Sequence, residues 1–98
     1  MSEKQIESYL VREVHKRGGI AYKFTSPGNP GVPDRLILLP DGRTIYVELK
    51  TEFGQLSKLQ HWQIGRMREL GAVVYTLKSI EQIKNFIKEV FGDAVQTA

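Results

Sequence analysis

The sequence predicts a single α/β domain in which a mixed β-sheet is flanked by helices, in the order helix, three strands, helix, strand, helix. Two patterns predict it: apolar residues recur at helical spacing in three segments, and β-branched or aliphatic runs form four others. A third observation is size, because a chain of 98 residues can bury one modest core. We therefore expect one domain over residues 1–98.

The first helix and the first strand are predicted from capping and spacing. Ser2 and Gln5 have the spacing of a capping box, and apolar residues then follow at helical intervals until Gly18. Residues 20–24 alternate in polarity and predict a strand. Residues 25–33 are too rich in proline and glycine for regular structure, so we expect a loop.

A β-hairpin is predicted next. Residues 35–39 and 44–50 are β-branched and aliphatic runs, and Pro40-Asp41-Gly42 separates them. Pro40 and Asp41 suit the central positions of a type I turn, and Gly42 can adopt the left-handed conformation of a bulged three-residue loop.

The register of this hairpin decides which side chains share a face. A three-residue loop pairs Leu39 with Arg43, and counting five residues outwards along each strand places Asp34 opposite Glu48. Because side chains alternate along a strand, Lys50 lies on the Glu48 face, and the apolar residues between them point to the other face. A two-residue loop would instead put Asp34 and Glu48 on opposite faces.

The second half of the chain predicts a connector, a helix, a strand and a helix. Residues 51–55 form the connector, and Ser57 can cap a helix that runs to about Leu70 and ends at Gly71. The residues expected on its apolar face are Leu56, Leu59, Met67 and Leu70. Residues 72–77 predict a buried strand, which should run parallel to the second hairpin strand because a helix crossover connects the two.

The last helix is predicted from its cap and its spacing. Ser79 and Gln82 are placed to cap it, and the apolar residues that recur at helical spacing are Ile80, Ile83, Ile87 and Val90. Residues 92–98 follow without such a pattern, and we expect this tail to fray.

The composition excludes several classes of protein. The chain has no cysteine, so it forms neither disulfides nor thiolate metal sites, and any metal would bind through oxygen or histidine. No apolar run approaches the roughly 20 residues that span a bilayer, and the polar N-terminus is unlike a signal peptide. We therefore expect a soluble, intracellular protein without a membrane partner, in the cytoplasm of a prokaryote or of an infected host. The net charge of +3 is compatible with a nucleic-acid partner.

Two short motifs carry a resemblance to a known family. Val32-Pro33-Asp34 followed by Val47-Glu48-Leu49-Lys50 resembles the signature of the PD-(D/E)XK nucleases. More narrowly, residues 3–87 resemble a stand-alone VRR-NUC domain, the virus-type replication and repair nuclease module. The further segments that carry this resemblance are Gly31, Leu56-Ser57-Lys58-Leu59-Gln60 and Leu70-Gly71-Ala72-Val73-Val74. The resemblance implies a restriction-endonuclease-like fold, in agreement with the predicted order of elements.

Phosphodiester hydrolysis explains why these residue types occur together. A divalent ion neutralises the developing charge and makes water acidic enough to attack. Mg²⁺ prefers few carboxylates and several retained waters, so Asp34 and Glu48 can supply two ligands, while Lys50 can hold the attacking water or the phosphate. We expect Mg²⁺ or Mn²⁺ and no small-molecule cofactor.

The resemblance adds three residues to the predicted site. It implies that Glu7 and the backbone carbonyl of Leu49 bind the metal, and that Gln60 lies at the active site. Glu7 falls on the buried side of its helix, where a carboxylate costs free energy unless a cation or hydrogen bonds compensate its charge. The alternative interpretation of Glu7 is a negative charge that interacts favourably with the helix N-terminus. The alternative interpretation of Gln60 is a side-chain amide that is hydrogen-bonded within the core.

Four further residues are candidates for contact with nucleic acid. Ser26, Gly28 and Asn29 lie in the loop ahead of Asp34, and Lys58 lies at the start of a predicted helix. Charged residues on helix faces are often only solvated, and that interpretation of Lys58 stays open.

The predicted function is that of a metal-dependent, structure-selective DNA endonuclease, and the resemblance suggests branched DNA such as Holliday junctions or flaps. A chain of this size has one active site, so cutting two strands symmetrically would call for a homodimer. The alternatives are a nuclease for RNA or single-stranded DNA and a non-catalytic nucleic-acid-binding module on the same fold.

Overall fold

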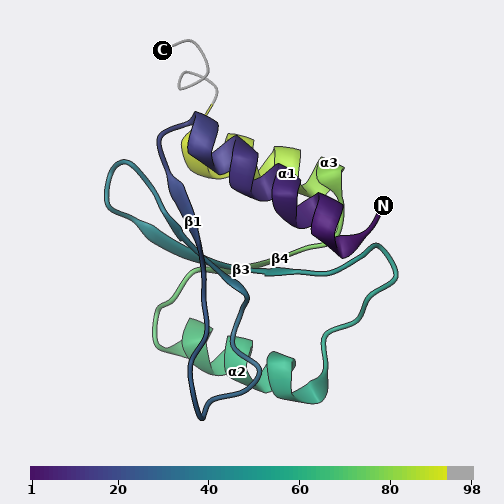
Figure 1. The fold of residues 1–98 in the computed structure, drawn as a ribbon. Coiled ribbons are helices and arrows are strands. Elements are labelled where there is room, and N and C mark those ends of the chain that lie inside the picture. The colour runs from purple at the N-terminus through teal and green to yellow at the C-terminus, as the bar shows by residue number, and fades with distance from the viewer. Residues whose placement is uncertain (93–98) are drawn as a thin grey trace.

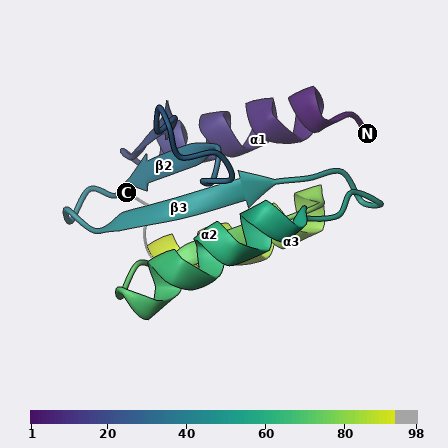
Figure 2. The ribbon, with the colours of Figure 1, turned by 90° about the horizontal axis from the view of Figure 1, so that it is seen from below.

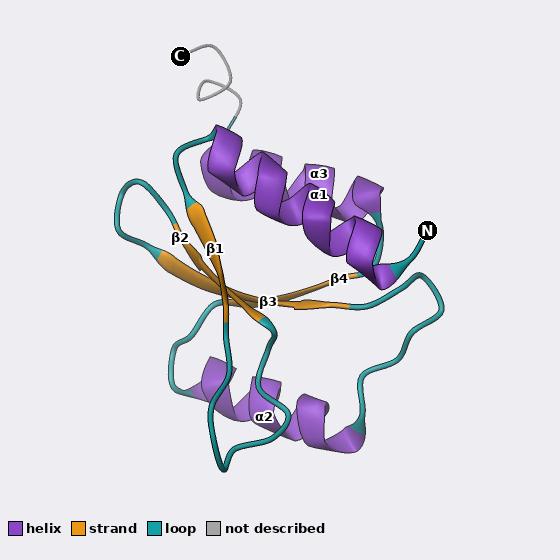
Figure 3. Ribbon diagram, viewed as in Figure 1, coloured by secondary structure: helices purple, strands orange, loops and turns teal. Residues whose placement is uncertain are grey.

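The computed structural model describes residues 1–92 of the chain. Its elements are α1 (Glu3–Lys16), β1 (Ile20–Lys23), β2 (Arg35–Leu38), β3 (Thr44–Leu49), α2 (Lys58–Glu69), β4 (Val74–Leu77) and α3 (Ile80–Phe91). Helices α1 and α3 lie side by side on one face of the sheet, and α2 covers the other face (Figures 1 and 3). Seen from below, β3 lies between α1 and α2 (Figure 2). The predicted fold class and the order αβββαβα are confirmed.

The ends of the strands differ slightly from the prediction. Each of the four strands is one or two residues shorter than predicted, with β1 ending at Lys23 and β4 beginning at Val74. A strand ends where its hydrogen-bonding partner ends, and the local sequence does not specify that point. Residues 93–98, most of the tail that was expected to fray, lie outside the described residues.

Serine residues cap all three helices. Ser2 and Gln5 form a complete capping box at the start of α1, and Ser57 caps α2. Ser79 accepts a hydrogen bond from the backbone of Gln82 at the start of α3, while the side chain of Gln82 accepts one from the backbone of Lys78. These caps satisfy backbone groups that a helix N-terminus otherwise leaves unpaired.

The sheet has the strand order β1-β2-β3-β4, in which β3 and β4 are parallel and the other pairs are antiparallel. The hairpin loop has the predicted form, because Leu39 donates its N–H to the carbonyl of Arg43 at 2.9 Å. Gly42 has a φ of 90° and supplies the left-handed residue of the loop. Since Arg35 pairs with Val47, the next residues outwards are Asp34 and Glu48.

The main core lies between the sheet and the α1/α3 layer. β3 contributes three side chains at alternate positions, Ile45, Val47 and Leu49. The residues that meet them from the helices and the other strands are Ile6, Leu10, Val14, Ile37, Leu39, Leu77, Ile83, Phe86, Ile87 and Val90. Within residues 1–92, no helix has the length and apolar character needed to cross a membrane.

The prediction of which residues form the apolar face of α2 is wrong in part. Leu59 and Leu70 are 43% and 80% exposed, and the one buried residue of this helix is Ile64. The helix is anchored at the edge strand β4, where Arg68 donates to the carbonyl of Val74 at 2.6 Å. Leu59 lies against Gly31 in the loop before β2 instead of against the sheet. Only a narrow stripe of α2 therefore contacts the sheet.

Candidate active site

The acidic pair of the predicted site lies at one end of the sheet, on the face covered by α2. Asp34 immediately precedes β2, and Glu48 is the next-to-last residue of β3. The core residues Val47 and Leu49 flank Glu48 in sequence and point to the α1/α3 layer, so the side chain of Glu48 points to the α2 side. The observed register therefore brings the two carboxylates to the same face, as the three-residue loop predicted.

Glu48 is the one buried charged side chain among residues 1–92, with 2% of its surface exposed. Its Oε1 accepts a hydrogen bond from the backbone N–H of Asp34 at 3.1 Å. Its Oε2 accepts one from Nε2 of Gln60 at 3.1 Å and lies 3.6 Å from Nζ of Lys50. Each oxygen of the buried carboxylate thus has a polar partner, as a buried charge requires.

The electrostatics of this carboxylate favour a cation. Burial raises the pKa of Glu48, and the negative charge of Asp34 raises it further, while Lys50 lowers it by less. The pKa of Glu48 is therefore raised overall. An additional positive charge between the two carboxylates would stabilise the ionised form of both.

Gln60 links the start of α2 to Glu48. Its Oε1 accepts the N–H of Ser57 at 2.9 Å, and its backbone N–H donates to Oγ of Ser57 at 3.1 Å, which completes a capping box. With Oε1 engaged there, Nε2 is free to donate to Glu48. The Ser57 and Gln60 spacing was the sequence signal for this orientation, and the sequence interpretation did not use it.

The backbone carbonyl of Leu49 is free on the side of the acidic pair. Lys50 donates its N–H to Leu77 on β4 at 3.0 Å, so the N–H and the C=O of Leu49 point toward β2. Continuing the register places Leu49 opposite Pro33, which has no N–H to donate. The hairpin therefore leaves an oxygen ligand available beside Glu48.

The structure does not bring Glu7 to the acidic pair. Glu7 lies 3.3 Å from Nζ of Lys23 and 3.2 Å from Nη2 of Arg35. Burial raises the pKa of Glu7, but the hydrogen bond from Lys23 and the charge of Arg35 outweigh it, so the pKa is lowered. Among residues 1–92, no three histidine or acidic side chains gather closely enough to hold a metal ion. Side-chain alternation explains why Glu7 is separate from the acidic pair. Arg35 points to the α1 side of the sheet, where it pairs with Glu7, and Asp34 points to the other side.

Comparisons with known proteins agree with this geometry. "Putative nuclease p44" of Acyrthosiphon pisum secondary endosymbiont phage 1 is 49% identical over 77 residues, which cover 79% of this chain and 83% of that protein. A solved structure described as a VRR_NUC domain matches with a TM-score of 0.83 and 30% identity, over 88% of this chain and 94% of that one. The chain belongs to the VRR-NUC family. No family model matches the sequence of this VRR-NUC protein.

The loop ahead of Asp34 packs onto α2 in this VRR-NUC protein. Gln63 donates to the carbonyl of Pro30 at 3.3 Å, and a Cβ on Gly31 would lie 2.9 Å from Cγ of Leu59. Gly31 has a φ of 94°, so it is suited both to this close approach and to the left-handed backbone. The loop is thus held against the helix that carries Gln60.

The predicted nucleic-acid contacts lie at the surface of the same region. Asn29 donates its backbone N–H to the carbonyl of Ser26 at 2.9 Å and its side-chain amide to Oγ of Ser26 at 3.0 Å, and Gly28 lies within this turn. Lys58 is exposed in the first turn of α2. None of these four residues hydrogen-bonds to Asp34 or Glu48, and their role stays a prediction.

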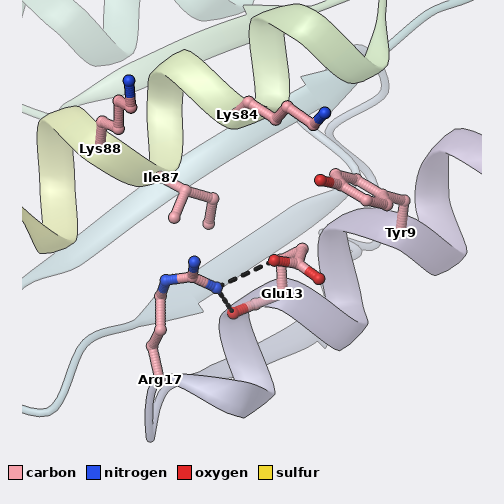
Figure 4. Close-up of a pocket in the computed structure, with 6 residues that line it drawn as sticks. All are labelled: Tyr9, Glu13, Arg17, Lys84, Ile87 and Lys88. Atoms are coloured by element: carbon pink, nitrogen blue, oxygen red, sulfur yellow. Dashed lines mark hydrogen bonds and ion pairs between the residues drawn. The ribbon is translucent and has the colours of Figure 1, made fainter. Parts of the chain in front are cut away.

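A second polar cluster lines a cavity between α1 and α3, on the other face of the sheet (Figure 4). Arg17 donates from Nη1 to Oε1 of Glu13 and to the carbonyl of Glu13, each at 3.0 Å. Burial raises the pKa of Glu13, but the hydrogen bonds from Arg17 and Lys16 outweigh it and the pKa is lowered. Glu13 has two cationic partners and a lowered pKa, whereas the pKa of Glu48 is raised, so this cluster is best explained as stabilising the end of α1.

We expect Gln60→Glu to lower the rate of nucleic-acid cleavage about 10- to 100-fold, the equivalent of a lost hydrogen bond to a charged group. Glutamate at this position retains the capping box, because its side-chain oxygen can still accept the N–H of Ser57. It removes the hydrogen bond from the amide to Glu48 and places a second carboxylate there. Gln5→Glu makes the same change in the capping box of α1 and should leave both cleavage and the free energy of unfolding unchanged. Full activity of Gln60→Glu would contradict a role for the Gln60 donor.

We expect Asp34→Ala to be more stable than the wild type at pH 8 in EDTA, by about 1 kcal/mol, because it removes a like charge beside Glu48. The variant keeps the backbone N–H that binds Glu48. Since the pKa of Glu48 is raised above 4.5, the repulsion acts on the ionised form at high pH. It is relieved as the pH falls through the raised pKa, so the difference should shrink toward pH 5.

Urea unfolding at pH 8 and pH 5 measures this difference. The matched control is Asp41→Ala, which removes an exposed acid whose pKa is lowered by hydrogen bonds from Arg43 and which should give no gain at pH 8. An Asp34→Ala variant that is no more stable than the wild type at pH 8 would show that the two carboxylates do not repel each other.

Proposed function

We propose that this VRR-NUC protein is a Mg²⁺- or Mn²⁺-dependent DNA endonuclease that acts on branched DNA. The observation that carries the proposal is the buried carboxylate of Glu48, whose pKa is raised beside Asp34 and which lies next to Lys50. Two acidic groups and an ammonium at one end of a sheet suit the hydrolysis of an anionic ester, because the acids attract a divalent cation and the ammonium attracts the phosphate.

The chemistry of the donors fits such an ion. The proposed ligands are the carboxylates of Asp34 and Glu48 and the backbone carbonyl of Leu49, all of them oxygen atoms. Mg²⁺ prefers oxygen ligands and keeps several positions for water and for substrate phosphate. Glu7 is not included, because Lys23 and Arg35 hold it on the other side of the sheet.

The residues around the acidic pair have distinct proposed tasks. A bound ion would neutralise charge on the phosphate and lower the pKa of water. Lys50, whose Nζ lies 3.6 Å from Glu48, orients the water or a phosphate oxygen and offsets negative charge in the transition state. Gln60 holds the Glu48 carboxylate in one orientation, and such positioning contributes to rate.

The surroundings of the acidic pair support a nucleic-acid substrate that is recognised through its phosphate backbone. The acidic pair lies where β2 begins and β3 ends, between the loop that contains Ser26, Gly28 and Asn29 and the first turn of α2, which exposes Lys58. These residues can contact a phosphate backbone without reading its sequence. Such contacts favour selection by the shape of the nucleic acid, as at a junction or a flap, over selection by base sequence.

We expect the wild type with Mn²⁺ or Mg²⁺ to cut a four-way junction and a flap faster than linear duplex DNA, single-stranded DNA or RNA. Asp34→Ala and Lys50→Ala should lose at least about 10³-fold in cleavage rate, because each removes a charge that acts in the transition state. Both should still bind the junction in a gel-shift assay. Lys88→Ala, an exposed lysine on the far face, is the control for loss of charge.

Three results would change this proposal. If the wild type binds DNA but cuts none of these substrates with either ion, the chain is a binding module. Faster cleavage of RNA or single-stranded DNA would assign a different substrate to the same site. Unchanged cleavage by Asp34→Ala and Lys50→Ala would place the chemistry elsewhere on the molecule.

A homodimer is the proposed active form on four-way junctions, because one chain carries one acidic pair and symmetrical cutting needs two. The edge strand β1 exposes Ile20 and Tyr22, and Leu38, paired with Ile20, is also exposed. An uncovered apolar surface of this kind can be buried by a second copy. We expect sedimentation velocity to give a dimer and Tyr22→Glu to give a monomer that nicks one strand. A wild type that is monomeric both free and on a junction would rule this out.

A further inference from the structure

The most exposed large apolar side chain in residues 1–92 is Phe53, with 86% of its surface accessible to water. Burying a phenylalanine is worth roughly 1.5–3 kcal/mol, so a folded chain gains nothing from leaving one in water. Phe53 therefore has no packing role within the described part of the chain. A ring in this position is free to contact a ligand.

Phe53 lies in a turn that begins directly after Lys50. Gly54 donates its N–H to the carbonyl of Thr51 at 2.9 Å, which closes the turn over residues 51–54. A Cβ on Gly54 would lie 3.2 Å from Cβ of Lys50, so the chain at Gly54 turns back close to that lysine. Phe53 is three residues from Lys50 and, even with an extended chain, at most about 11 Å away between Cα atoms.

The charge directly before Phe53 favours contact of the ring with a base over contact with a phosphate. Glu52, directly before Phe53, is an exposed carboxylate and repels a phosphate backbone. The face of an aromatic ring stacks on any base, and each stacked base contributes roughly 1–3 kcal/mol to binding. In a continuous duplex the base faces are already stacked on one another, so only an unpaired base is available.

We propose that Phe53 stacks on an unpaired base next to the scissile phosphate and thereby makes the enzyme favour flaps and junctions over continuous duplex. This inference rests on the proposed nuclease function of the Asp34 and Glu48 site. Because the turn begins directly after Lys50, the exposed ring lies within a few residues of the lysine to which the proposed function assigns the phosphate, and stacking there would both bind and orient the strand. Phe53 is thus the residue that selects branched substrates.

A second exposed aromatic residue lacks this placement. Trp62 on α2 is 58% exposed, and the guanidinium of Arg66 lies 5.6 Å from the centre of its ring. It follows Gln60 by two residues, which on a helix is a rotation of about 200°. Because Gln60 points to Glu48, Trp62 points away from the acidic pair.

The test compares Phe53→Ala, Phe53→Leu and Phe53→Tyr on a flap and on a linear duplex of the same sequence. We expect alanine and leucine to lower kcat/KM on the flap about 5- to 100-fold and to change duplex cleavage less than about twofold, since no base is unpaired there. Tyrosine, which keeps the aromatic face, should retain the flap activity. The control is Leu70→Ala, which removes another exposed apolar side chain at the far end of α2 and should behave as the wild type.

A second measurement detects stacking of Phe53 on a base in the absence of cleavage. A flap that carries 2-aminopurine beside the cleavage position is titrated with protein in EDTA, and its fluorescence should fall with the wild type and Phe53→Tyr but not with Phe53→Ala. Wild-type flap activity in Phe53→Ala, or in Phe53→Leu, would overturn the stacking role. If the wild type cuts no nucleic acid at all, the proposed function fails, and the fluorescence result still decides whether Phe53 stacks on a base.

Discussion

The hydrogen-bonded pair between Leu39 and Arg43 is the constraint on which the site depends. It closes a three-residue loop whose last residue, Gly42, adopts a left-handed backbone. Since every residue further along the hairpin inherits this register, Asp34 comes to lie opposite Glu48. A shift of one residue would turn one of the two carboxylates to the apolar core and would place core residues in water.

One face of the sheet packs into the main core, and the other face carries the acidic pair. Toward α1 and α3, β3 presents only apolar side chains, which form the main core. Toward α2, the same strand presents Glu48, whose burial beside Asp34 raises its pKa and leaves the unliganded site with unfavourable charge repulsion. Functional sites commonly carry such a cost, and the apolar packing on the opposite face offsets it.

Helix α2 contributes to the site more than to the core. It buries one residue, Ile64, yet its capping box orients the amide of Gln60 toward Glu48. The loop before β2 packs against the same helix through Gly31 and Leu59. The segment that delivers Asp34 and the helix that holds Glu48 are therefore tied together, and a change in the position of one alters both carboxylates.

The order of the elements, the serine caps and the hairpin register all follow from the sequence, because they depend on contacts between residues that are near each other along the chain. The opposition of Asp34 and Glu48 belongs to this group. Two features required the folded chain: the pairing of Glu7 with Lys23 and Arg35, and the exposure of Leu59 and Leu70. Both depend on how a helix is placed against the sheet, which is set by packing between segments distant in sequence and not by any local pattern. The contact of Gln60 with Glu48 has both sources, because the capping box that orients Gln60 is local and the position of α2 beside β3 is not.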